Sequence, residues 1–131
     1  MSNLIGLEDK FFIAGSKGMV GSAIKRTLIK NGYGNKKIGG EILGPSREEL
    51  DLTNFASLKC WFKKNNPSVV IIAAAKVGGI YANSNMPFDF ILENLKIQNN
   101  LIELAWEFGV KRLLFLGSSC IYPRNCPQPI S

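Results

Sequence analysis

The sequence contains no histidine, and this absence excludes several kinds of catalytic site. A Ser-His-Asp or Cys-His arrangement cannot be assembled from this chain alone, and a zinc site would lack its usual imidazole ligand. The three cysteines, Cys60, Cys120 and Cys126, show no metal-binding spacing. An odd number of cysteines in a chain expected to be cytosolic argues against a disulfide framework. We therefore predict no metal site and no disulfide framework.

Long hydrophobic runs are missing as well. No run approaches the ~18 apolar residues of a membrane span, and residues 1–10 lack the basic start and long apolar centre of a signal peptide. The net charge of +6 is modest and comes from scattered residues, including isolated basic pairs at 36–37, 63–64 and 111–112. A nucleic-acid surface would cluster such charge. These observations predict a cytoplasmic protein that binds neither nucleic acid nor membrane, with a mild preference for anionic ligands such as phosphates.

Short apolar runs and helix-like periodicity alternate along the chain, of which 46% is apolar. The length of 131 residues favours one domain, residues 1–131. Buried strands are expected at 10–14, 36–43, 68–75 and 110–116, and helices at 18–30, 54–65 and 88–108. This alternation predicts an α/β fold with a doubly wound parallel sheet, the Rossmann fold.

Local signals mark the helix ends. Asn31-Gly32 ends the first helix, Asn54 or Thr53 caps the second, and Gly109 is the C-cap candidate of the third. Gly39-Gly40 weakens the prediction of the second strand.

Two segments show no pattern of a regular element. Residues 77–87, rich in glycine and asparagine, are expected to form a loop, and residues 123–131 contain three prolines. Because no helix follows the fourth strand, we expect the fold to be incomplete.

The strongest local motif lies between the first strand and the first helix. Its sequence is Gly15-Ser16-Lys17-Gly18-Met19-Val20-Gly21, or G-x-x-G-x-x-G. The first glycine permits a sharp turn, the second allows close approach to a pyrophosphate, and the third lets helix and strand pack closely. The phosphates would lie at the amino end of the helix, where unpaired N–H groups favour negative charge. A tight turn without a ligand is the alternative, but the strand–loop–helix context favours a dinucleotide.

The residues after the second strand bear on which dinucleotide binds. Arg47 follows this strand where an NAD site usually has an acidic residue, so it could pair with the 2′-phosphate of NADP. An ordinary solvated arginine is the alternative. Lys17 is a second basic candidate. Asp51 could reach the adenine, or it could cap the helix that begins near Asn54.

Two further segments follow strands at the edge of the sheet where ligands of open α/β folds bind. The small residues of Ala73-Ala74-Ala75 would let a cofactor lie against the backbone, and Lys76 could reach a phosphate or ribose, or be a surface lysine. Gly117-Ser118-Ser119-Cys120 brings two hydroxyls and a thiol to the same edge. Ser118 could instead be a turn residue, and Cys120 a small buried apolar residue.

Three segments together resemble the GDP-L-fucose synthases of the extended short-chain dehydrogenase/reductase family. They are GSKGMVGSAI at 15–24, AAAKVGGI at 73–80 and FLGSSCIYP at 115–123. The spacing of Arg47-Glu48-Glu49-Leu50-Asp51-Leu52 fits as well. The glycine motif identifies only the superfamily, whereas the other segments are more specific.

The resemblance implies an activity and a set of site residues. These enzymes convert GDP-4-keto-6-deoxy-D-mannose into GDP-L-fucose by epimerisation at C3 and C5 and reduction of the 4-keto group with NADPH, and the whole enzyme is expected to be a homodimer. Ser118 matches the serine of the Ser-Tyr-Lys triad, and Cys120 matches the acid/base cysteine of epimerisation. The implied NADP contacts are Gly15, Ser16, Lys17, Gly18, Met19, Val20, Gly21, Arg47, Asp51, Leu52, Leu116, Gly117, Ser118 and Ser119, beside Ala74 and Lys76 from the strand-end argument.

The sequence also departs from this family. The Tyr-x-x-x-Lys motif is not found after Ser118, and the histidine that partners the cysteine is missing. By the same resemblance, the C-terminal strands and the substrate domain of the family are absent. We therefore expect a truncated chain that binds NADP(H) weakly and has no reductase activity by itself. Another extended family member, a 4-epimerase or dehydratase with tightly bound NAD, and a non-catalytic nucleotide-binding module stay open as alternatives.

Overall fold

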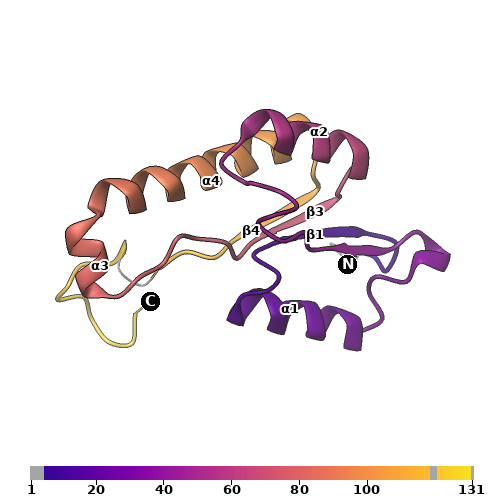
Figure 1. Ribbon diagram of the computed structural model, residues 1–131. Coiled ribbons are helices and arrows are strands. Elements are labelled where there is room, and N and C mark those ends of the chain that lie inside the picture. The colour runs from indigo at the N-terminus through magenta and orange to yellow at the C-terminus, as the bar shows by residue number, and fades with distance from the viewer. Residues whose placement is uncertain (1–4, 119–120, 131) are drawn as a thin grey trace.

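The computed structural model describes residues 5–118 and 121–130. Its centre is a parallel sheet of four strands in the order β2-β1-β3-β4, with helices on both faces (Figure 1). The predicted doubly wound α/β fold is confirmed. The strands are β1 (Lys10–Ala14), β2 (Glu41–Leu43), β3 (Val69–Ile72) and β4 (Arg112–Phe115), and the helices are α1 (Met19–Lys30), α2 (Phe55–Asn65), α3 (Ile80–Asn85) and α4 (Pro87–Glu107), with a 3₁₀ turn η1 (Lys36–Ile38).

The central strands β1 and β3 form the core because their side chains are apolar on both faces. On one face Phe12 pairs in register with Val70, and both are fully buried beneath α2 and α4. On the other face, Phe11 and Ile13 pack against the apolar side of α1. Figure 1 shows this division, with α1 on one side of the sheet and α2 and α4 on the other.

The helix ends follow the predicted chemistry. Asn54, rather than Thr53, caps α2, because its side chain accepts a hydrogen bond from the backbone N–H of Ser57 at 3.1 Å. Helix α4 ends at Glu107 with Phe108 as its C-cap residue, and Gly109 follows in the left-handed conformation at φ +65°. Glycine adopts this conformation at little cost, so Gly109 terminates the helix one position beyond the cap.

Two sequence predictions need correction. Residues 36–43 do not form one strand: η1 comes first, Gly39 follows at φ +91°, and only Glu41–Leu43 pair with β1. Residues 77–87 are not all loop, since they include the six-residue helix α3, which lies directly before α4. So short a helix carries too few apolar positions for its periodicity to be recognised.

At the amino ends of the strands, a buried carboxylate joins three of them. Asp9 accepts hydrogen bonds from the Lys111 ammonium at 2.6 Å, the Ser68 hydroxyl at 2.7 Å and the Gly6 backbone N–H at 2.7 Å. Burial raises the pKa of Asp9, but these hydrogen bonds outweigh it and hold the pKa below the ordinary value of 3.8. The ion pair therefore ties the starts of β1, β3 and β4 together.

Strand β4 lies at an edge of the sheet, and its residues are exposed. The apolar side chains of Leu113, Leu114 and Phe115 are 39–49% accessible. Strand β4 therefore forms an exposed edge of the sheet. Within the described residues, no helix has the length and apolar character needed to cross a membrane.

Candidate functional site

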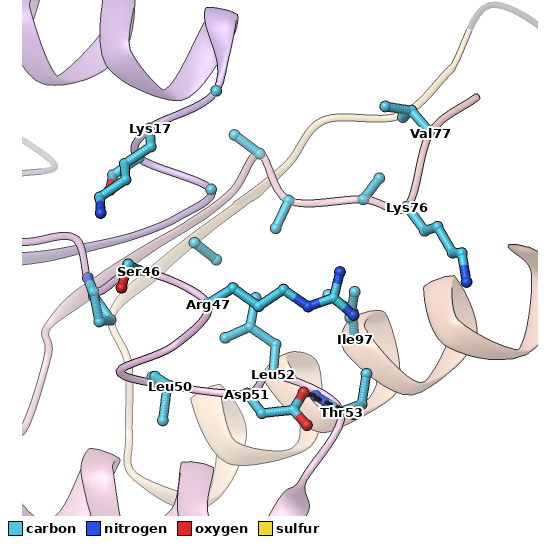
Figure 2. A pocket seen from close by; sticks show the side chains of 18 of the residues that line it. Lys17, Ser46, Arg47, Leu50, Asp51, Leu52, Thr53, Lys76, Val77 and Ile97 are labelled. Atoms are coloured by element: carbon cyan, nitrogen blue, oxygen red, sulfur yellow. Dashed lines mark hydrogen bonds between the residues drawn. The ribbon is translucent and has the colours of Figure 1, made fainter. Parts of the chain in front are cut away.

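The candidate site lies where the chain crosses from one half of the sheet to the other. Strand β1 is followed by a connection to β2 on one side, whereas β3 lies on its other side. Such a switch point leaves a crevice outside the carboxyl ends of the two strands. A cavity of about 610 Å³ occupies this place, within the size range of ligand pockets. Figure 2 shows the side chains of most of the residues that line it.

The glycine turn forms one wall of the cavity and has no room for larger residues. Gly15 has φ +85°, and a Cβ atom there would lie 2.7 Å from the Ala73 carbonyl oxygen. A Cβ atom on Gly21 would overlap the carbonyl oxygen of Gly15. The Gly18 N–H donates to the same carbonyl at 3.0 Å. The first glycine thus permits the turn, and the third lets α1 begin directly under it, as the motif predicts. The first glycine also lets the chain after β1 approach the chain after β3, which the motif does not predict.

The amino end of α1 opens toward this cavity. Gly18 is the N-cap residue in an extended conformation, and it offers no side-chain oxygen to the first-turn N–H groups. No acidic residue lies in that first turn. Unpaired N–H groups and the helix dipole make this position attractive to an anion. Because Gly18 itself lines the cavity, a phosphate placed there would reach these donors.

Ser16 has a structural task within the turn. Its side chain is buried, and its hydroxyl donates to the Gly44 carbonyl oxygen at 2.9 Å. This bond ties the glycine turn to the segment after β2, which forms the opposite wall. Ser16 therefore positions the two walls relative to each other.

The segment after β2 presents Arg47 to the cavity. The turn is held by hydrogen bonds from the Ser46 N–H to the Glu49 carboxylate at 2.6 Å and from the Leu50 N–H to the Ser46 carbonyl at 2.9 Å. The first bond is the main reason that the pKa of Glu49 lies below its usual value. The Arg47 side chain is 75% exposed, and Figure 2 shows it reaching across the cavity.

Asp51 lies at the rim of the cavity but does not cap helix α2. Its carboxylate accepts hydrogen bonds from the Thr53 hydroxyl at 2.7 Å and the Thr53 N–H at 2.9 Å. These bonds hold the pKa of Asp51 below its ordinary value. The carboxylate is thus charged at neutral pH and fixes the turn before Asn54, while it faces the site.

A carboxylate that the sequence did not indicate joins two of the three cations that line the cavity. Glu93, on α4, accepts from Arg47 through Oε1 at 2.9 Å and from the Lys76 ammonium through Oε2 at 2.9 Å. The hydrogen bond from Lys76 is the main reason that the pKa of Glu93 is lowered. No local pattern marks Glu93, because its partners are 46 and 17 residues away in the chain.

Lys76 is fixed by the same helix. Its backbone N–H donates to the Asn94 side chain at 2.7 Å, and its carbonyl accepts from the Asn94 amide at 3.0 Å. Its ammonium lies 5.6 Å from the centre of the Phe90 ring. Asn94 was also missed by the sequence argument, since a helical asparagine carries no signal of this contact.

The structure brings most of the predicted cofactor contacts around one cavity. Those lining it are Gly15, Ser16, Lys17, Gly18, Met19, Val20, Arg47, Asp51, Leu52, Ala74 and Lys76. Gly21 lies behind the turn as a packing residue. Leu116, Gly117 and Ser118 follow β4 and are outside the lining, whereas Ser119 and Cys120 lie outside the described residues. The structure thus gathers most of the predicted cofactor contacts at one cavity; of the two predicted catalytic residues, Ser118 lies outside its lining and Cys120 lies outside the described residues.

The relatives found by comparison with known proteins agree with one another. A profile of the NAD dependent epimerase/dehydratase family matches residues 11–131. The chain is 50% identical over 130 residues to GDP-L-fucose synthase 1 of Arabidopsis thaliana, covering 99% of this chain and 38% of that protein. It is 44% identical over 124 residues to GDP-L-fucose synthase of Escherichia coli, covering 95% of this chain and 37% of that protein.

Solved structures agree with the sequence relatives. A GDP-mannoheptose C4 reductase from Campylobacter jejuni with NADP bound has a TM-score of 0.86 and 37% identity, over 97% of this chain and 38% of that one. A GDP-L-fucose synthetase from Naegleria fowleri bound to NADP has a TM-score of 0.79 and 29% identity, over 97% and 36%. The chain spans somewhat more than a third of the length of each of these proteins. The match over residues 11–131 shows that this chain belongs to the NAD dependent epimerase/dehydratase family.

Proposed function

We propose that this chain forms the NADP-binding part of a GDP-L-fucose synthase, an enzyme that epimerises GDP-4-keto-6-deoxy-D-mannose and reduces its 4-keto group. The observation that carries the proposal is the cavity at the β1–β3 switch point, which joins the glycine turn to Arg47 and Lys76. The 50% identity to the Arabidopsis enzyme supports the choice of substrate.

The residues of the cavity suit a dinucleotide phosphate. The uncapped amino end of α1 would hold the pyrophosphate, and the small residues Ala73 and Ala74 leave the floor of the crevice open to a flat ring. Arg47 would take the 2′-phosphate, because its guanidinium matches a phosphate in geometry and charge. Lys17 lies near the same turn, since its charge contributes to the lowered pKa of Glu48 and Glu49.

NADPH would supply the hydride for the reduction, while the chain's residues bind and orient the reactants. We assign Ser118 to hydrogen-bonding of the keto oxygen and Cys120 to proton transfer at the epimerised carbons. Ser118 follows β4, which lies next to β3 in the sheet. The residues directly after β3 line the cavity. We also propose that the whole enzyme works as a homodimer.

Related reductases point to a second candidate substrate class. The C. jejuni protein above is a GDP-mannoheptose C4 reductase. Its fold matches 97% of this chain. A GDP-heptose would leave the cofactor assignment unchanged and alter only the sugar. The higher identity to fucose synthases, 50% against 37%, favours the deoxymannose substrate.

A binding measurement tests the cofactor assignment. The 131-residue chain should bind NADP⁺ more tightly than NAD⁺ in calorimetric titrations. Replacing Arg47 by Gln should weaken NADP⁺ binding by about tenfold, because one charge-assisted phosphate contact is lost. NAD⁺ binding should change by less than about twofold, because NAD⁺ has no 2′-phosphate. Arg26→Gln, on the exposed side of α1, is the matched control. Equal binding of the two nucleotides would refute the NADP assignment.

A chimera tests the activity. This chain, joined to the C-terminal part of the Arabidopsis relative that it does not match, should oxidise NADPH with GDP-4-keto-6-deoxy-D-mannose and yield GDP-L-fucose. Ser118→Ala should lower kcat by at least about a hundredfold, since an oxyanion donor is lost. A chimera that binds NADPH but oxidises it only with a GDP-heptose would favour the second candidate.

A further inference from the structure

Glu93 is a negatively charged residue in the lining of a cavity that is suited to phosphates. Its charge would repel an anionic ligand. Its side chain is only 18% exposed, and each carboxylate oxygen holds one cation at 2.9 Å. Arg47 and Lys76, two of the three cations that line the cavity, are therefore already paired within the chain. The proposed function gives Glu93 no task.

The two ion pairs differ in how firmly they are held. Lys76 is 31% exposed, and Asn94 fixes its backbone through two hydrogen bonds. Arg47 is 75% exposed and stands on a surface turn, so solvent screens its pair with Glu93 and its side chain can turn away. An exchange of partners at this site would therefore move Arg47 and leave the Lys76–Glu93 pair in place.

We propose that Glu93 lowers the preference for NADP over NAD by competing with the 2′-phosphate for Arg47. Without this phosphate, Arg47 stays on Glu93; with it, Arg47 leaves Glu93 for the phosphate. The inference rests on the proposed function, because it requires that Arg47 faces the 2′-phosphate of NADP.

The competition affects one class of nucleotide only. A nucleotide without a 2′-phosphate leaves the Arg47–Glu93 pair intact, so Glu93 does not alter its affinity. A nucleotide with this phosphate must break the pair, which lowers its affinity. Glu93 thus narrows the difference in affinity between NADP and NAD.

The test uses two small probes that differ in the 2′-phosphate, adenosine 2′,5′-bisphosphate and adenosine 5′-monophosphate. Glu93→Gln keeps the shape of the side chain and removes its charge. We expect this variant of the full chain to bind the bisphosphate about fivefold more tightly, equivalent to ~1 kcal/mol, with the monophosphate changed by less than about twofold. A purely structural role would alter both affinities together.

Two further variants isolate the effect. Glu107→Gln is the matched control, because Glu107 lies on the same helix and pairs with Lys59 at 2.6 Å outside the cavity. In an Arg47→Gln background, Glu93→Gln should change the affinity for the bisphosphate by less than about twofold, since no arginine remains to be released. This comparison stays decisive if the single variant also affects stability.

The outcomes separate the two proposals. Binding of the bisphosphate that is unchanged or weaker in Glu93→Gln refutes the role of Glu93 and leaves the NADP assignment standing. A gain of equal size for both probes, or in the Arg47→Gln background, refutes it too. Failure of the parent chain and every variant to bind either probe refutes the proposed function itself, and this inference with it.

Discussion

Replacing Gly21 by alanine tests whether the glycine turn is built for close packing. A Cβ atom at this position would overlap the Gly15 carbonyl oxygen and lie 2.8 Å from the Gly15 carbonyl carbon and 3.1 Å from the Ser16 Cα. All three atoms belong to the backbone, so no side chain can rotate away. The turn itself, or the start of α1, has to move.

The magnitude follows from two opposing effects. Alanine favours a helix over glycine by about 1 kcal/mol, whereas overpacking at a rigid site costs about 1–3 kcal/mol. Because the contacted atoms are all backbone, we take the upper part of that cost, about 2–3 kcal/mol, and expect the free energy of unfolding to fall by about 1–2 kcal/mol. With an m-value of roughly 1.5 kcal/mol/M, the urea midpoint would fall by about 1 M. Binding of NADP⁺ should weaken by at least about tenfold, because the donors at the amino end of α1 shift.

The assay is urea unfolding followed by tryptophan fluorescence. Trp61 reports on the core, since its ring lies 4.3 Å from that of Phe12, whereas Trp106 is 84% exposed and adds a constant background. Gly117→Ala is the stability control, because a Cβ atom there meets nothing within 4 Å. A Gly21→Ala chain as stable as the parent, with unchanged NADP⁺ affinity, would show that the turn does not require glycine.

Three further predictions concern the fold around the site. Asp9→Asn should lower the free energy of unfolding by about 2 kcal/mol at pH 7, because it removes a buried ion pair with a half-exposed Lys111. Since the pKa of Asp9 is lower in the folded chain, this stabilisation is present above about pH 4 and is lost as the pH falls through the folded pKa. The urea midpoints of parent and variant should therefore converge in acid. A difference that stays constant with pH would contradict the ion pair. Asn54→Ala should cost about 1 kcal/mol in urea unfolding by removing the α2 cap, and no loss would refute its capping role. Phe62→Ala should cost about 3–5 kcal/mol, because this fully buried ring packs between Phe12 and Phe108; a loss under about 1 kcal/mol would show that the core collapses around the cavity.

The sequence predicted the central elements well, because their signals are local. The continuous apolar run of β3 and the strand–glycine–helix succession around Gly15 need no distant contact to be recognised. The prediction of a single strand at 36–43 was wrong, also for a local reason: a 3₁₀ turn comes first, and Gly39 then adopts the left-handed conformation. Helix α3 was missed because six residues carry too little periodicity.

The site was predictable only where a motif defines it. The glycine turn and Arg47 could be placed at the crevice because strand ends meet there in this fold. Glu93 could not be predicted, because it reaches the cavity only when α4 packs on the sheet. Its partner Arg47 lies 46 residues away in the chain. The roles of Ser118 and Cys120 rest on the family resemblance and stay predictions.

The most direct test of the account is a nuclear magnetic resonance titration of the ¹⁵N-labelled chain with NADP⁺. We predict that the largest amide shifts fall on residues 16–20 at the start of α1 and on residues 46–48 around Arg47. The same titration with NAD⁺ should shift residues 16–20 but leave 46–48 nearly unchanged. Shifts confined to other surfaces, or none at residues 16–20 at saturating NADP⁺, would contradict the claim that this turn holds a dinucleotide.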